Sequence, residues 1–457
     1  MNSSGVVNIK LIKTASDIVK EIRSGNLSAA DVAMTYLERI RSLEGKISAW
    51  EFLNEEHVFE QTAAVDNNLS RGKVCGRLCG VPIGVKDIFN TRGFPVEMGS
   101  PIWKGHKAGN DARVVEQMMW DDGIIMGKTV TAEFAVHFPG ATRNPHNIKH
   151  TPGTSSSGSA AAVASLMVPV ALGTQTAGSL IRPASYCGIY AMKPTFGMIP
   201  RTGVLKTMET LDQVGFFTRS VRDIKLLFDS ARIGGRDHPL KEEKLLKDIG
   251  RKFWKVGIVK GSIWNGVSEY AKKDFIDFIS RLANENILIE EAGLPEGFEN
   301  VHAIHSHIYN SDLAYYFKEE YYRQPELMSD VLKHHIKLGF SYPPDNYSSA
   351  LKEQRTLIHR LDSVFEEYDI LLSLSSFGEA PVEEARDKDY CPIWTLCHVP
   401  AVNVPVFTGP KGLPFGLQVV AKRYNDLLLI NFLDYLDDLE LVPPVKVAEG
   451  GTGIETV

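Results

Sequence analysis

The sequence predicts an α/β fold, in which a large mixed, mostly parallel β-sheet is flanked by helices and carries a helical variable lobe. From about residue 76, short β-branched and apolar runs alternate with helical runs, which is typical of α/β folds. These short runs are apolar throughout, as expected of strands that are buried on both faces. The chain has 457 residues, 44% hydrophobic and 23% charged, so it can bury a large core as a soluble protein.

Two helices are expected before residue 50. The first begins near Thr14 or Ser16, either of which can cap it, and ends near residue 25. Ser28 is expected to cap the second helix, over residues 29–42. The apolar face of that helix consists of Val32, Tyr36, Leu37 and Ile40.

The next elements alternate between strand and helix. Residues 80–85 are expected to form a strand and residues 111–122 a helix that Gly123 stops. Further strands are expected at 124–126 and 168–172. This part belongs to a core that we place at residues 70–225 of a single domain spanning 1–457.

Residues 235–350 are more charged and more helical than the rest, and we expect them to form an inserted variable lobe. Strands are expected within it at 255–259 and 287–289. After this lobe, apolar runs typical of buried strands occur again. Residues 448–457 are expected to be a loose tail. The later strands are expected at 369–374, 402–406 and 415–420.

Charge and composition exclude several classes of protein. The net charge of −6 is spread along the chain, with no basic stripe, so no nucleic acid is expected as a partner. No segment has the apolar length of a membrane span or a signal peptide, so a cytoplasmic protein is expected. The five cysteines form no regular framework, which favours unrelated thiols over disulfides.

Three segments carry groups suited to acyl-transfer chemistry. Lys86 ends the apolar run 80–85, and burial would lower its pKa enough to make it a base. Alternatively, Lys86 pairs with Asp87 in solvent. The Gly/Ser-rich segment 151–159 opens into an Ala-rich helix, a pattern that also caps helices or binds phosphate. The third segment, 173–183, presents Ser179 in a tight turn where backbone amides can form an oxyanion hole.

Together these segments resemble the amidase signature family. The lysine segment, the Gly/Ser loop and the nucleophile loop occur in the family's order, and Ser155 and Ser179 are separated by the family's 24 positions. The resemblance covers most of the chain and includes further motifs at Gly127–Phe134, Arg143–Pro145, Lys193–Thr195, Leu211–Gly215, Arg219–Val221, Val399–Ala401 and Gly412–Pro414.

The resemblance implies the amidase-signature fold and a catalytic triad. Ser179 would be the nucleophile, Ser155 would bridge by hydrogen bonds after a cis Thr154–Ser155 peptide bond, and Lys86 would be the base. The oxyanion hole would consist of the backbone N–H groups of Thr176, Ala177, Gly178 and Ser179. No metal or organic cofactor is implied.

The sequence departs from the family pattern near the nucleophile. Gln175 stands where the family usually has Asp, so the support of the loop is in question. The usual Arg two residues after the nucleophile is replaced by Ile181, and Arg182 follows. Thr154 stands where Gly is common and would narrow the acyl pocket, and Ala177 replaces another common Gly.

Other signals are weaker. Gly127-Lys128-Thr129 lacks the earlier glycine of a phosphate-binding loop, which argues against an NTPase. The H-x-x-H-x-H pattern of His302, His305 and His307 lacks a fourth ligand and favours a solvated or pocket-lining helix over a metal site. Candidate substrate-binding residues are Thr154, Phe134, His137 and Trp394, although core packing explains the last three equally well.

The leading hypothesis is a free-standing amidohydrolase, monomeric or homodimeric. It would act on small or aryl amides, with carbamates or urea-like compounds as further substrates. The alternative is a chain resembling the glutaminyl amidotransferase A subunit, which needs partner chains and tRNA. A non-catalytic scaffold is disfavoured because Lys86, Ser155 and Ser179 are all present.

Overall fold

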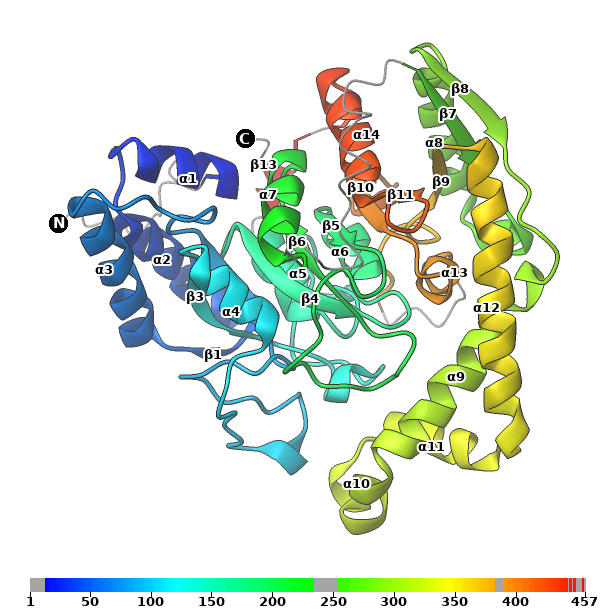
Figure 1. The fold of residues 1–457 in the computed structure, drawn as a ribbon, viewed down its shortest axis with the longest axis horizontal. Helices are drawn as coiled ribbons and strands as arrows, with labels where there is room; N and C mark the ends of the chain where they lie inside the picture. Colours follow the sequence, from blue (N-terminus) through cyan, green and yellow to red (C-terminus); the bar gives the residue numbers. More distant parts are fainter. Residues whose placement is uncertain are drawn as a thin grey trace.

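A computed structural model describes residues 13–233, 253–382, 389–442, 444–445, 447–448 and 454–455. Its centre is an 11-stranded sheet with the order β1-β3-β2-β4-β6-β5-β10-β11-β9-β7-β8 (Figure 1). The strands are β1 (Trp50–Leu53), β2 (Pro82–Lys86), β3 (Ile124–Thr129), β4 (Val170–Gln175), β5 (Tyr190–Lys193), β6 (Gln213–Thr218), β7 (Trp254–Ile258), β8 (Ile287–Glu291), β9 (Ile370–Leu374), β10 (Ala401–Thr408) and β11 (Pro414–Ala421).

The α-helices flank this sheet or project from it. They are α1 (Ala15–Arg23), α2 (Ala29–Ile47), α3 (Glu55–Ser70), α4 (Arg113–Trp120), α5 (Ser157–Ala164), α6 (Ile181–Cys187), α7 (Val221–Ala231), α8 (Glu269–Leu282), α9 (Val301–Tyr316), α10 (Lys318–Arg323), α11 (Asp330–Ser341), α12 (Pro344–Glu367), α13 (Cys391–Leu396) and α14 (Asp426–Asp438). Among the described residues, none of these helices combines the length and apolar composition needed to cross a bilayer.

The expected mixed sheet is confirmed, but the expectation that it is mostly parallel is wrong. Only four of the ten strand pairings in the described sheet are parallel: β2 with β3 and β4, and β7 with β8 and β9. The turn between β10 and β11 is short, and such a connection can only join antiparallel neighbours. Apolar composition shows that a strand is buried, but it does not show the direction of its neighbour.

The N-terminal helices follow their capping signals. Thr14 is the N-cap of α1, where its side chain accepts a hydrogen bond from the Asp17 backbone N–H. Ser28 forms a capping box with Asp31 at the start of α2. Helix α2 continues to Ile47, beyond the expected residue 42, because Leu43 and Ile47 extend its buried face.

The region expected as a variable lobe has two parts. Strands β7 and β8 are confirmed, but they extend the main sheet beyond β9 instead of forming a sheet of their own. The helices α9 to α12 project to one side of the molecule, with α10 at the far end (Figure 1). Residues 234–252, which include the expected start of the lobe, lie outside the described residues.

The expected loose tail is described only in part. Val447–Ala448 (β12) pairs with Ile454–Glu455 (β13) in a short antiparallel sheet. The other residues from 449 to 457 lie outside the described part of the chain.

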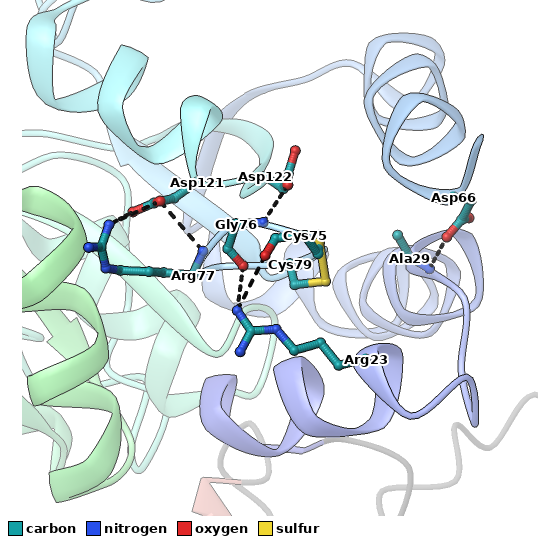
Figure 2. The surroundings of a disulfide bond; sticks show 9 residues. All are labelled: Arg23, Ala29, Asp66, Cys75, Gly76, Arg77, Cys79, Asp121 and Asp122. Atoms are coloured by element: carbon teal, nitrogen blue, oxygen red, sulfur yellow. Dashed lines mark hydrogen bonds and ion pairs between the residues drawn. A yellow bond between two sulfur atoms is a disulfide. The ribbon is translucent and has the colours of Figure 1, made fainter. Parts of the chain in front are cut away.

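The expectation of five unrelated thiols is wrong for one pair, because Cys75 and Cys79 form a disulfide. A tight loop brings their Cα atoms to 5.4 Å, which is within the range that a disulfide requires. Figure 2 shows this loop between α1 and the residues that follow α4. The Gly76 carbonyl accepts a hydrogen bond from Arg23 at 2.7 Å, and the Gly76 N–H donates one to Asp122 at 2.6 Å. Cys187, Cys391 and Cys397 are buried free thiols.

Candidate active site

Lys86 is the last residue of β2, a central strand that pairs in parallel with β3 and β4. Ligand sites of α/β sheets lie at the carboxyl ends of such strands. The Lys86 side chain is completely buried. Its Nζ atom lies 3.0 Å from Ser155 Oγ, 3.0 Å from Ser156 Oγ and 2.8 Å from Thr174 Oγ1.

Burial lowers the pKa of Lys86 well below its ordinary value, and the charge of Asp212 only partly opposes this effect. The alternative pairing of Lys86 with Asp87 does not occur. The Asp87 carboxylate instead pairs with the buried Lys128 at 3.2 Å. Within the described chain, Lys86 has no carboxylate partner, so its neutral amine can accept a proton.

The three hydroxyls around Lys86 are not equivalent. Ser156 Oγ donates its proton to the Thr174 carbonyl at 3.2 Å, so towards Lys86 it can only accept. The Ser155 hydroxyl makes no other hydrogen bond within the described chain, and its proton is free to point at the Lys86 lone pair. Ser156 is therefore excluded as a proton relay, whereas the hydroxyls of Ser155 and Thr174, neither of which makes another hydrogen bond within the described chain, keep a proton to pass to Lys86.

The loop that carries Ser155 is anchored by its backbone. The Ser155 carbonyl accepts a hydrogen bond from Thr131 Oγ1 at 2.9 Å. Among the described residues every peptide bond is trans, so the expectation of a cis Thr154–Ser155 bond is wrong for this structure. The trans form avoids the cost of about 3–4 kcal/mol that a non-proline cis bond carries.

Gln175 supports the nucleophile loop in spite of its departure from the family pattern. Its Oε1 atom accepts hydrogen bonds from the backbone N–H groups of Leu180 and Ile181, both at 3.0 Å. These groups are otherwise unpaired donors at the start of α6. Its Nε2 atom donates to Thr395 Oγ1 at 2.9 Å. The neutral side-chain amide of Gln175 therefore caps the start of α6, as a carboxylate at this position would.

The carbonyls of the nucleophile loop are held on two sides. Thr176 O accepts a hydrogen bond from His305 Nε2 at 2.9 Å, and Ala177 O accepts one from Thr395 Oγ1 at 2.8 Å. In a trans peptide the N–H points opposite to the carbonyl. The N–H groups of Ala177 and Gly178 therefore point away from His305 and Thr395.

Free donors remain on this loop. The backbone N–H groups of Ala177, Gly178 and Ser179 make no hydrogen bond within the described residues. The Ser179 side chain is partly exposed, and within the same residues its hydroxyl is also unpaired. An exposed hydroxyl beside several free amides is the arrangement that acyl transfer needs.

Arg182 packs directly against this loop. A Cβ atom at Gly178 would lie 2.7 Å from the Arg182 guanidinium, so a larger residue there would have to displace it. Arg182 Nε donates to Asp389 at 2.6 Å, and both residues are buried. The basic group near the nucleophile is therefore balanced by an acid from a distant part of the chain.

A cleft of about 1100 Å³ adjoins these loops. Gly153, Ser157, Ala177 and Arg182 line it from the catalytic side. Further lining residues come from α9, α11 and the segment after β3, and include His137, His302, His305, Tyr309, His334 and His335.

The four expected substrate-binding residues lie in different places, one on the cleft and three in buried positions. His137 lines the cleft, where its ring centroid lies 5.9 Å from that of Tyr309. Phe134 and Trp394 are fully buried in the core, and neither is among the cleft-lining residues. Thr154 is buried beside Ser155, and its Oγ1 atom has no partner in the described chain.

His302 and His305 of α9 and His334 and His335 of α11 line the cleft, whereas His307 is not among its lining residues. Within the described residues, no group of three or more His, Cys, Asp or Glu side chains is arranged to hold a metal ion. Burial lowers the pKa of both His305 and His335 to about 4, so both are neutral at physiological pH. A neutral imidazole at His305 must carry its proton on Nε2, because Thr176 O can only accept.

Sequence reasoning missed several supporting residues. Thr176 Oγ1 donates to Asp212 at 2.7 Å, and Asp212 also accepts from the backbone N–H of Thr207 at 2.7 Å. Asp212 lay within a motif of the resemblance, but that motif gave it no role. Thr395 and Asp389 come from far along the chain, and no local pattern connects them with the nucleophile loop.

A family model described as Amidase matches residues 31–430. The chain belongs to the amidase family. This amidase is similar to the A subunit of glutamyl-tRNA(Gln) amidotransferase from Lysinibacillus sphaericus, with 32% identity over 91% of this chain and 93% of the relative. It is also similar to the corresponding A subunit, the one numbered 2, from Clostridium acetobutylicum, with 29% identity over 90% of this chain and 96% of the relative.

The fold of the amidase also matches solved structures. One was described as a vestigial protein complex that reveals the evolutionary origins of an s-triazine catabolic enzyme. The match has a TM-score of 0.85 and 25% identity, and covers 94% of this chain and 100% of the other. Family and relatives together identify the amidase as an enzyme that acts on carbon–nitrogen bonds.

Proposed function

We propose that this amidase hydrolyses C–N acyl bonds through an acyl-enzyme intermediate on Ser179. Its substrates are small or aryl amides, with carbamates and urea-like compounds accessible to the same groups. The observation that carries the proposal is the environment of Lys86, a buried amine without a carboxylate partner in the described chain that contacts Ser155 at 3.0 Å. Such an amine is neutral and can act as a general base.

The first half of the reaction forms the ester. Lys86 accepts the proton of Ser155 Oγ while Ser155 accepts that of Ser179 Oγ. The Ser179 oxygen then adds to the carbonyl carbon. The resulting oxyanion accepts hydrogen bonds from the loop N–H groups, those of Ala177 and Gly178 among them. The proton returns through Ser155 to the leaving nitrogen, and the C–N bond breaks.

The second half regenerates the enzyme. Water loses a proton to the same relay and adds to the ester carbonyl. The C–O bond to Ser179 breaks, and the Ser179 oxygen recovers its proton from Lys86 through Ser155. Acid and base roles thus alternate on one lysine, and no further group is required.

The test is hydrolysis of a panel of p-nitroanilides, primary amides and aryl carbamates by the purified chain. We expect turnover that falls by roughly 10³-fold or more in Ser179→Ala, since the nucleophile acts together with its base. Ser70→Ala, on the exposed end of α3, is the control and should match the wild type. Equal rates for Ser179→Ala and the wild type would contradict the proposal.

A second candidate is an amidotransferase component of the A type, which the two curated relatives favour because each aligns over nine-tenths or more of its length. In that case the purified chain would turn over nothing in the panel. Glutamine would release ammonia only once partner chains are present. Turnover of simple amides by the chain alone excludes this candidate as the sole function.

A further inference from the structure

The charges of the cleft differ in sign from the charge of the whole molecule. The chain has a net charge of −6. Yet the described residues that line the cleft include three permanent cations, Arg143, Lys149 and Arg182, and a single carboxylate, that of Asp389. A local excess of one sign in a concave site attracts ligands of the opposite sign.

One of these cations is already neutralised. Arg182 and Asp389 form a buried ion pair at 2.6 Å, so their charges cancel inside the cleft. Arg143 and Lys149 remain. Both are exposed, and within the described residues neither side chain makes an ion pair or a hydrogen bond. Within the part of the chain that the structure describes, the cleft therefore has two exposed positive charges without an ion-pair partner.

The inner part of the cleft offers a polar group without a partner. Ser157 is 2% exposed and lines the cleft, and within the described chain its Oγ atom makes no hydrogen bond. Leaving such a hydroxyl buried and unpaired costs about 1–3 kcal/mol, which a ligand oxygen can offset. Ser157 lines the same cleft as Ala177, whose backbone N–H is one of the free donors of the loop within the described residues.

We propose that the substrate is an anionic amide, with the scissile carbonyl near Ser157 and Ala177 and a carboxylate that reaches Arg143 and Lys149. This inference rests on the proposed function and names the substrate class of the same site. The hydroxyl and the two cations provide polar contacts at both ends of the molecule. The imidazoles of α9 and α11 and the phenol of Tyr309 line the same cleft.

The test compares matched substrates of equal chain length. The mono-p-nitroanilides of succinic and glutaric acid carry a carboxylate, whereas butyryl and valeryl p-nitroanilide do not. We expect kcat/KM to favour the anionic pair by about tenfold or more, the factor that one or two hydrogen bonds to a charged group provide. The preference should shrink at about 1 M salt, where the Debye length is about 3 Å.

The variant Arg143→Gln/Lys149→Gln should lose this preference, because its kcat/KM for the anionic pair should fall to that for the uncharged pair. Arg71→Gln/Lys73→Gln is the matched control, because it removes the same two charges from exposed positions outside the cleft. Equal rates on both pairs, or a preference that survives in Arg143→Gln/Lys149→Gln, would overturn the anionic substrate and leave the amidase mechanism intact.

A binding measurement decides the proposal even without turnover. Calorimetry on Ser179→Ala should show tighter binding of glutaramate than of valeramide, and the advantage should vanish when Arg143→Gln/Lys149→Gln is added. Equal affinities would overturn the proposal. Absence of turnover for all four anilides, combined with selective glutaramate binding, would instead overturn hydrolysis of these amides and retain the anionic ligand.

Discussion

At the residue scale, the hydroxyl groups around Lys86 differ in whether they still have a proton to donate to it. A neutral lysine amine has two protons to donate and one lone pair. Its three neighbours are hydroxyls at 2.8–3.0 Å. Ser156 has committed its proton to the Thr174 carbonyl, so the two adjacent serines, similar in sequence, differ in chemical role.

This difference predicts unequal effects of two similar mutations. Ser155→Ala removes the proposed relay and should lower kcat by about 10²–10⁴-fold, the usual contribution of general acid–base catalysis. Ser156→Ala removes only an acceptor and a bond to Thr174, and we expect a loss of about tenfold. Steady-state kinetics on a p-nitroanilide measure both, and circular dichroism checks the folding. A larger loss in Ser156→Ala would reverse the assignment.

At the scale of elements, helix α9 connects the projecting helices to the nucleophile loop. His305 contributes its Nε2–H to the Thr176 carbonyl at 2.9 Å. Its ring also stacks on Tyr309, with 5.7 Å between ring centroids. Helix α9 therefore supplies both a wall of the cleft and a brace behind the free amides of the loop.

The brace predicts a specific pattern for His305 variants. His305→Leu leaves the Thr176 carbonyl unpaired in a buried position and should lower kcat about tenfold, with a smaller change in KM. His305→Gln keeps an N–H donor at this position and should recover most of the loss. His307, two residues further along α9, does not contact the loop within the described residues, so His307→Leu is the control. Equal defects in His305→Gln and His305→Leu would contradict a positioning role.

At the scale of the whole molecule, several buried titratable groups connect stability to pH. His398 donates from Nε2 to the Thr210 carbonyl at 2.7 Å and stacks on Phe196. Burial lowers the pKa of His398 to about 4, whereas an unfolded chain binds this proton near pH 6.5. The unfolded state therefore binds more protons between pH 6.5 and 4, and the contribution of His398 to stability is lost as the pH falls through this window.

We predict that the free energy of unfolding falls more steeply in the wild type than in His398→Asn between pH 6.5 and 4.5. Asparagine does not titrate and tolerates the left-handed backbone of this position, where φ is 62°. Between pH 6.5 and 4.5, the wild type should lose about 1–2 kcal/mol more of its free energy of unfolding than His398→Asn does. Urea unfolding at a series of pH values measures this difference. Parallel pH profiles would show that His398 does not contribute.

Features that depend on neighbouring residues could be predicted from the sequence. Apolar runs located eight of the eleven strands of the described sheet and missed β1, β5 and β6. Thr14, one of two candidate caps, and Ser28 mark helix starts, and ordered motifs point to Lys86, Ser155 and Ser179. Buried strands and helix caps can be predicted from local composition, because both depend on residues that are close together in the sequence. The order and spacing of the motifs predict which residues are catalytic, because they match the positions of catalytic residues in the family that the chain resembles.

Features that depend on residues distant in the chain are visible in the folded structure and not in the sequence. The structure shows that Arg182 forms an ion pair with Asp389 and that His305 donates a hydrogen bond to the Thr176 carbonyl. It also shows that His137 lines the cleft, whereas Phe134 and Trp394 are buried in the core. It also corrected the strand directions, since an apolar run is the same beside a parallel or an antiparallel neighbour. Part of the cleft lining comes from α9 and α11, which are far along the chain from the loop that carries Ser179, and folding brings them together in a way that no local pattern encodes.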